Sequence, residues 1–187
     1  IIFLLFLFNN YRTKWDPVRP DFYPWGEIIK IGHRGAPVLA QENTVDSFAK
    51  AFKTDIKGIE LDKRYADYCK NKHRLIVYQQ NLSQLKTHEK FDLVSLNKVL
   101  EHVYDPTKLL KLSSKFLKKN GVIYIEVPDV LAKRKGKYRQ EFCIDHLHVF
   151  SIPSLCILAY KAGLRPLIFK RIHEPSGKYT LYGFFKK

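Results

Sequence analysis

The chain has 187 residues, and its 33 Lys and Arg against 18 Asp and Glu give a formal net charge of +15. A content of 45% hydrophobic and 14% aromatic residues excludes a disordered chain, a collagen-like repeat and a disulfide miniprotein. This length suits one domain. Cys69, Cys143 and Cys156 have no paired or metal-type spacing, which favours a reducing compartment.

The basic excess is uneven along the chain. Residues 91–187 carry a net charge of +10, and residues 1–90 carry +5. We therefore expect an anionic partner, either a small molecule or an anionic lipid surface, at the second half. The densest basic run, residues 133–139, contains only one aromatic residue, so stacking on nucleic-acid bases is not expected.

The first 26 residues read as a separate stub and connector. Residues 1–8 are all apolar, but this run is too short to span a bilayer. Residues 15–25 are rich in Pro and aromatic residues, which indicates an irregular connector. The sequence contains no Met, so we expect it to be part of a longer reading frame. We expect a cytoplasmic protein, with membrane association through the apolar N-terminus as the alternative.

From residue 27 onward, strand and helix patterns alternate. Strands are expected at residues 28–31, 58–62, 75–78, 91–96, 122–127, 167–169 and 179–184. The helices between them are expected from Thr44 or Asp46, through Tyr65 and Tyr68, from Asp105-Pro106 to Asn120-Gly121, and over 151–162. The pattern predicts an α/β fold: one doubly wound, mostly parallel seven-stranded sheet with a C-terminal β-hairpin, formed by residues 27–187.

Residues 91–187 resemble the C-terminal half of a class I S-adenosylmethionine-dependent methyltransferase. The stretches that carry this resemblance are Phe91-Asp92-Leu93-Val94, Val99-Leu100-Glu101-His102-Val103, Asp105-Pro106, residues 117–128 and Asp145-His146-Leu147-His148-Val149-Phe150-Ser151. The resemblance implies a Rossmann-like fold, the cofactor S-adenosylmethionine and a small-molecule methyl acceptor. The acceptor and the oligomeric state are not readable from the sequence.

Residues 27–62 resemble a different family, the glycerophosphodiester phosphodiesterases. The matching stretches are Ile31-Gly32-His33-Arg34-Gly35-Ala36-Pro37, Gln41-Glu42-Asn43-Thr44 and Gly58-Ile59-Glu60-Leu61-Asp62. In that family a His at the position of His33 acts in acid–base chemistry, and acids at the positions of Glu60 and Asp62 hold a divalent cation. Because front and back resemble different enzymes, the sequence looks chimeric.

The phosphodiesterase resemblance stops after the strand at 75–78. Gln79-Gln80 stand where that family carries a His-Asp pair, and glutamine cannot replace a general acid or base. A barrel of eight βα units also needs at least about 200 residues, more than the chain has after its connector. Methyl transfer is therefore the leading hypothesis. The alternatives are phosphodiester hydrolysis by an incomplete site and a noncatalytic basic binding module.

The candidate cofactor residues follow the first three predicted strands. Gly32 and Gly35 let backbone approach the methionine end of the cofactor, but His33, Arg34 and Pro37 crowd this turn, so weakened cofactor binding is expected. An acid at the end of the second strand can accept hydrogen bonds from the ribose hydroxyls, which indicates Glu60, with Asp62 as the nearby substitute. Asn81 or Gln80, after the third strand, is the candidate contact of adenine, and a polar turn is the competing interpretation.

The candidate reactive residues follow the fourth strand and precede the last helix. Asn97, Glu101 and His102 are expected to flank the methyl group and the acceptor, although His102 could instead pack near Asp105. His146 and His148 alternate, so an extended segment would place both on one face. We expect His146, beside Asp145, to accept the acceptor's proton. No tight metal-binding spacing is present, so a metal is expected only in the phosphodiesterase alternative.

Overall fold

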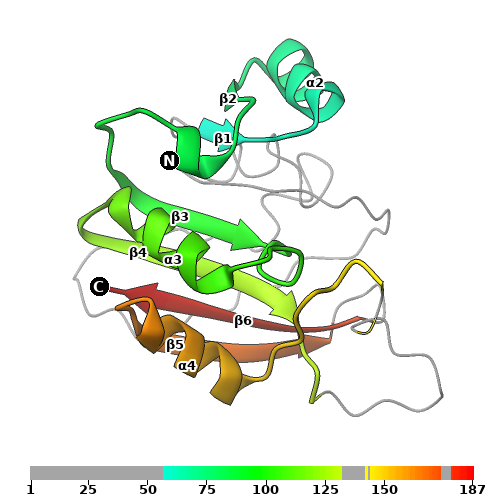
Figure 1. The fold of residues 1–187 in the computed structure, drawn as a ribbon, viewed down its shortest axis with the longest axis vertical. Coiled ribbons are helices and arrows are strands. Elements are labelled where there is room, and N and C mark those ends of the chain that lie inside the picture. The colour runs from blue at the N-terminus through cyan, green and yellow to red at the C-terminus, as the bar shows by residue number, and fades with distance from the viewer. Residues whose placement is uncertain (1–56, 132–141, 143, 174–177) are drawn as a thin grey trace.

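A computed structural model describes residues 57–131, 142, 144–173 and 178–187 (Figure 1). The strand expected at 28–31, the helix expected from Thr44 or Asp46, and the stub and connector of residues 1–26 lie outside the described residues. The six strands of the described part form two sheets, and we therefore keep the single seven-stranded sheet as a prediction. None of the helices in the described part is long and apolar enough to cross a membrane.

A small parallel unit opens the described chain. It consists of β1 (Lys57–Ile59), α2 (Lys63–His73) and β2 (Ile76–Tyr78), with β1 and β2 paired in parallel. α2 begins at its N-cap Asp62, whose side chain accepts a hydrogen bond from the Arg64 backbone N–H. The strand predicted at 58–62 is therefore shorter than expected, because its acidic end already belongs to the loop and the helix cap.

A mixed four-stranded sheet follows, in the order β3-β4-β6-β5. β3 (Phe91–Asn97) is parallel to β4 (Leu117–Pro128). β6 (Tyr179–Lys186) is antiparallel to both β4 and β5 (Arg165–His173), so the predicted C-terminal hairpin is confirmed. The α/β Rossmann-like class is confirmed as well, but this sheet is mixed and not mostly parallel.

Two helices cover one face of the four-stranded sheet (Figure 1): α3 (Pro106–Lys115) and α4 (Ile152–Lys161). The core between the sheet and these two helices is built from alternate residues of the strands and from the inner faces of the helices. Its fully buried members include Val94, Leu96, Leu110, Ile123, Ile125, Val127, Leu155, Leu181 and Phe185. The same core reaches Ile59 of β1 and Leu82 of the short helix η1 (Leu82–Gln84). The two sheets thus share one hydrophobic core.

The end of α3 differs from the sequence-based prediction. The sequence predicts a helix that runs to Asn120-Gly121, but α3 is capped at Phe116. The next residue, Leu117, is the first of β4 and pairs with Phe91 of β3. The register between β3 and β4 then shifts between Phe91 and Leu93. Asn120-Gly121 therefore lies inside an irregular strand, because the strand pairing of Leu117 ends the helix before the glycine is reached.

Asp105 begins α3, as the sequence predicts, and its carboxylate accepts a hydrogen bond of 2.9 Å from the Lys108 backbone N–H. Replacing this cap with Ala should lower the free energy of unfolding by about 1 kcal/mol, because a helix-terminal N–H loses its partner. Asp105→Asn keeps a capping oxygen and should remain close to wild type. Urea unfolding of both variants tests this, and an equal loss in Asp105→Asn would contradict a capping role.

Candidate active site

The site lies where two chain segments meet at the carboxyl ends of β3 and β4. The loop after β3 turns through Lys98, whose φ is 53°, and the His102 N–H bonds to the Val99 carbonyl at 3.0 Å. The segment before α4 reaches this loop through the His148 N–H, which donates to the Glu101 carbonyl at 3.2 Å. Adjacent strand ends in a parallel pair form the edge at which α/β proteins bind ligands.

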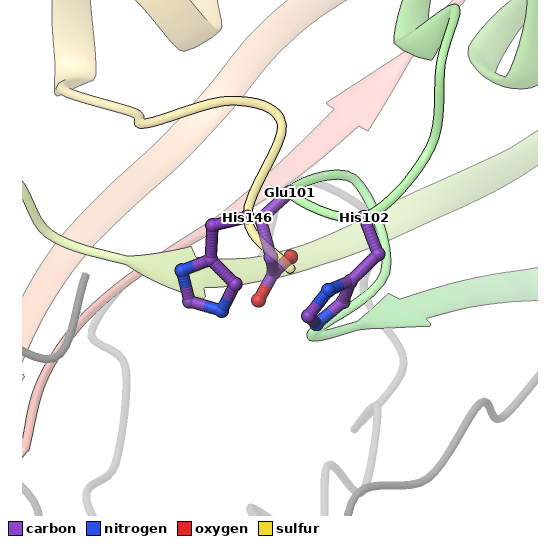
Figure 2. A group of neighbouring side chains, drawn as sticks. All are labelled: Glu101, His102 and His146. Atoms are coloured by element: carbon purple, nitrogen blue, oxygen red, sulfur yellow. The ribbon is translucent and has the colours of Figure 1, made fainter. Parts of the chain in front are cut away.

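Glu101, His102 and His146 converge at this edge (Figure 2). One ligand-type atom from each of the three side chains lies within 4.8 Å of the others. The two imidazole rings meet edge to face with centroids 4.8 Å apart. Figure 2 shows the Glu101 carboxylate on the same side of the loop as both rings. The structure therefore brings together three of the residues that the sequence singled out, from two segments far apart in the chain.

A carbonyl group determines which nitrogen of His102 carries the proton. Nδ1 of His102 lies 2.9 Å from the backbone oxygen of Asp145. A carbonyl oxygen only accepts, so Nδ1 must be the donor, and in the neutral ring Nε2 keeps its lone pair. Nε2 is buried and has no hydrogen-bond partner. His102 thus hydrogen-bonds to Asp145, and its buried Nε2 is an acceptor nitrogen without a partner.

Glu101 is the most deeply buried acid of the site, with 1% of its surface exposed. Burial raises the pKa of its carboxyl group to about 7, and the charge of Glu126 acts in the same direction. Backbone hydrogen bonding and the charges of Lys98 and His102 oppose this rise. Oε2 of Glu101 is buried without a hydrogen-bond partner. Buried polar oxygens in folded proteins normally have a hydrogen-bond partner, either a protein group or a bound molecule such as water.

His148 has a different role from His146. Its Nε2 lies 3.4 Å from the Tyr104 carbonyl, and its ring is 6.1 Å from that of Phe150. With its backbone N–H bound to Glu101, His148 holds the segment against the loop after β3. His146 and His148 are both half-buried, whereas Leu147 and Val149 are exposed, so the burial pattern agrees with one shared face. The two rings nevertheless have different partners, His102 for His146 and Tyr104 with Phe150 for His148.

A second polar group, which the sequence reading did not single out, adjoins the loop. Glu126 of β4 is 2% exposed and its Oε2 accepts a 2.6 Å bond from the Tyr124 hydroxyl. Lys98 Nζ lies 3.7 Å from Glu126 Oε1 and donates to the Thr180 hydroxyl at 2.5 Å. The network anchors the turn that follows β3. An acid in the apolar run 122–127 was the signal available in the sequence.

The two acids after β1 have different partners. Glu60 is 9% exposed, and its Oε1 accepts a 2.8 Å bond from the Asp62 backbone N–H. Asp62 instead caps α2 and pairs with the Arg64 guanidinium at 2.8 Å. Hydrogen bonds from the Arg64 side chain and backbone lower the pKa of Asp62 to about 2. The carboxylate of Asp62 is therefore engaged in local structure.

The remaining cofactor candidates divide into described and undescribed residues. Asn81 is exposed and caps η1, its Oδ1 accepting from the Ser83 N–H and hydroxyl, each at 3.1 Å. This supports the polar-turn interpretation for its side-chain oxygen. Asn97 is 6% exposed at the end of β3. Gly32, His33 and Gly35 lie outside the described residues.

Comparison with known proteins identifies the methyltransferase resemblance over most of the chain. A family model described as a methyltransferase domain matches residues 38–167. The chain is 39% identical over 69 residues to the ubiquinone biosynthesis O-methyltransferase of Pelagibacter ubique (strain HTCC1062). The aligned region covers 37% of this chain and 28% of that protein.

A solved structure has the same fold. It is the 1,6-didemethyltoxoflavin-N1-methyltransferase of Burkholderia thailandensis, with 1,6-didemethyltoxoflavin and S-adenosylhomocysteine bound. The TM-score is 0.58 at 20% identity, over 75% of this chain and 64% of that one.

The other resemblance is short. Over 32 residues the chain is 61% identical to glycerophosphodiester phosphodiesterase domain-containing protein 4 of Mus musculus. The aligned region covers 17% of this chain and 5% of that protein. The chain thus spans less than a third of each of these two curated relatives.

Proposed function

Because the chain belongs to the class I S-adenosylmethionine-dependent methyltransferase family, we propose that it methylates a hydroxyl group of a small molecule held beside Glu101, His102 and His146. The observation that carries this proposal is the convergence of bare, buried acceptor atoms, Nε2 of His102 and Oε2 of Glu101, at the ligand-binding edge of the sheet. A hydroxyl group, with one proton to give, complements these acceptors.

Methyl transfer to a hydroxyl group must remove one proton. The acceptor oxygen forms a bond to the methyl carbon, the carbon–sulfur bond breaks, and its electron pair neutralises the sulfonium sulfur. The hydroxyl proton must leave the oxygen. We predict that an imidazole nitrogen of His102 or His146 accepts it. The Asp145 carbonyl contributes by holding His102 in the tautomer whose Nε2 is free of hydrogen.

The cofactor is proposed to bind along the neighbouring loops. Glu60, nearly buried at the end of β1, would accept hydrogen bonds from the ribose hydroxyls through the oxygen that Asp62 does not use. Gly32 and Gly35 remain the proposed contacts of the methionine end, Asn81 or Gln80 that of adenine, and Asn97 the residue beside the methyl group.

Two observations support the proposed chemical class of the methyl acceptor: the charge of the chain and the activity of one relative. The Pelagibacter protein is an O-methyltransferase, which favours an oxygen acceptor here. The half of the chain that contains the acceptor side carries a net charge of +10, which favours an anionic molecule. A hydroxylated aromatic carboxylate such as 3,4-dihydroxybenzoate combines both properties and is a suitable probe.

Calorimetric titration of the full chain with S-adenosylmethionine and S-adenosylhomocysteine tests the proposal. We expect one binding site, and Glu60→Ala should weaken binding by about tenfold, since hydrogen bonds to a charged group are lost. Asp62→Ala is the matched control and should leave the affinity unchanged. Transfer of labelled methyl to 3,4-dihydroxybenzoate tests the acceptor class. Absence of binding heat for both cofactor forms at millimolar concentration would overturn the proposed function.

The phosphodiesterase alternative has less support. Its match covers 32 residues, Asp62 is committed to α2 and Arg64, and Gln79-Gln80 replace the pair that the chemistry needs. The 32-residue match is therefore a resemblance of sequence that supplies no complete hydrolytic site.

A further inference from the structure

We propose that Glu101, His102 and His146 bind one divalent transition-metal ion. Two imidazoles and a carboxylate form the donor set, and all three ligand atoms already lie within 4.8 Å of one another. Nitrogen-rich sites of this kind favour Zn²⁺, Co²⁺ or Fe²⁺, whereas Mg²⁺ prefers oxygen ligands. Three protein ligands also leave coordination positions open.

The hydrogen bonding of the three residues fits this role. Nδ1 of His102 is occupied by the Asp145 carbonyl, so the ring orientation is set and Nε2 is the available donor atom. A ligating histidine commonly has its other nitrogen bound to a carbonyl or carboxylate in this way. Asp145 Oδ2, 3.7 Å from the same Nδ1, adds negative charge behind the ring. Both groups lie on the Nδ1 side of the ring and leave Nε2 on the side of the cluster.

The unpartnered atoms are the independent observation that points to a ligand. Oε2 of Glu101 and Nε2 of His102 are buried and lack hydrogen-bond partners. No ion pair joins Glu101 to any residue in the described part of the chain. The nearby ammonium of Lys98 is directed to Thr180 and Glu126 instead. A cation between the three side chains would satisfy the orphaned oxygen and the orphaned nitrogen together.

This inference rests on the proposed function for its role in catalysis. An acceptor hydroxyl that occupied an open coordination position would lose its proton more readily, because the cation stabilises the resulting oxyanion. The proton would then pass to solvent, and His102 and His146 would act as ligands and not as proton acceptors. Metal binding itself requires neither S-adenosylmethionine nor an acceptor, so it can be tested separately.

The experiment titrates the full chain, freed of metal by a chelator, with Zn²⁺, Co²⁺ and Mg²⁺ and follows heat and the Co²⁺ visible absorption. We expect one Zn²⁺ or Co²⁺ per chain and much weaker binding of Mg²⁺. Loss of one ligand should weaken Zn²⁺ binding by more than about 100-fold in His146→Ala, since loss of an outer-shell partner alone costs 10–100-fold. His88→Ala is the matched control, because His88 is an exposed histidine that does not belong to the cluster.

The outcomes distinguish this inference from the proposed function. Circular dichroism checks folding, and His102→Gln provides a second variant in which one nitrogen ligand is lost. If Zn²⁺ binds equally well to wild type, His146→Ala and His102→Gln, or does not bind at all, the metal site is disproved. Binding of S-adenosylmethionine by the same metal-free protein would then leave the proposed function standing, with the histidines as proton acceptors.

Discussion

Replacing Leu155 with Ala is expected to lower the free energy of unfolding by about 2–5 kcal/mol. Leu155 lies on the inner face of α4 with none of its surface exposed, and it belongs to the single core beneath the helices. Truncation removes buried apolar surface and leaves a cavity that the close-packed surroundings fill only partly. Urea unfolding of the full chain, followed by circular dichroism, measures the loss.

Ile157→Ala supplies the matched control for this prediction. Ile157 lies on the same helix but is 58% exposed, so the same kind of truncation removes little buried surface. Its effect should stay within about 0.5 kcal/mol, as for ordinary surface substitutions. Equal destabilisation by the two variants would contradict burial of Leu155 as the cause of the effect.

Helices and strands were predictable wherever local chemistry agreed with the packing. The Asp105-Pro106 pair and the Ser151 cap begin α3 and α4 as expected, because each satisfies free N–H groups of the first turn. The apolar stripes also identify the faces that are buried. Sheet order was less accessible, since the insertion of β6 between β4 and β5 depends on pairing of distant segments.

The sequence predicted where the site residues lie in the fold, but not which side chains contact each other. Glu101 and His102 follow a strand, so their location at the ligand-binding edge could be inferred. The partnership of His102 with Asp145 and His146 was not readable, because a loop interaction between distant segments has no local signature in the sequence. For the same reason, a search for tightly spaced metal ligands missed the donor set.

Gly121 illustrates how a correct signal can be assigned to the wrong cause. Asn120-Gly121 was interpreted as a helix end, since glycine commonly follows a helix. The structure gives another reason for a glycine here. A Cβ at this position would lie 2.7 Å from the Phe91 carbonyl oxygen and 3.1 Å from that of Asp92. The requirement comes from the close approach of β3 and β4 at their register shift.

Replacing Gly121 with Ala is therefore expected to destabilise the fold by about 1–3 kcal/mol, the usual range for overpacking. Both contacts are backbone oxygens of β3, so no flexible side chain can move aside, and relief requires displacement of the strand. Urea midpoints of the full chain measure this effect.

Gly58→Ala is the appropriate comparison, because Gly58 is also a strand glycine but has room for a methyl group. Its nearest neighbour is a Val77 methyl carbon at 3.6 Å, an ordinary van der Waals contact. Ala at this position restricts the unfolded chain and should be neutral or stabilising by up to about 1 kcal/mol. If both variants lost the same stability, general strand effects and not the contact with β3 would explain Gly121. A selective loss in Gly121→Ala would assign the requirement for glycine to the close contact with the β3 backbone.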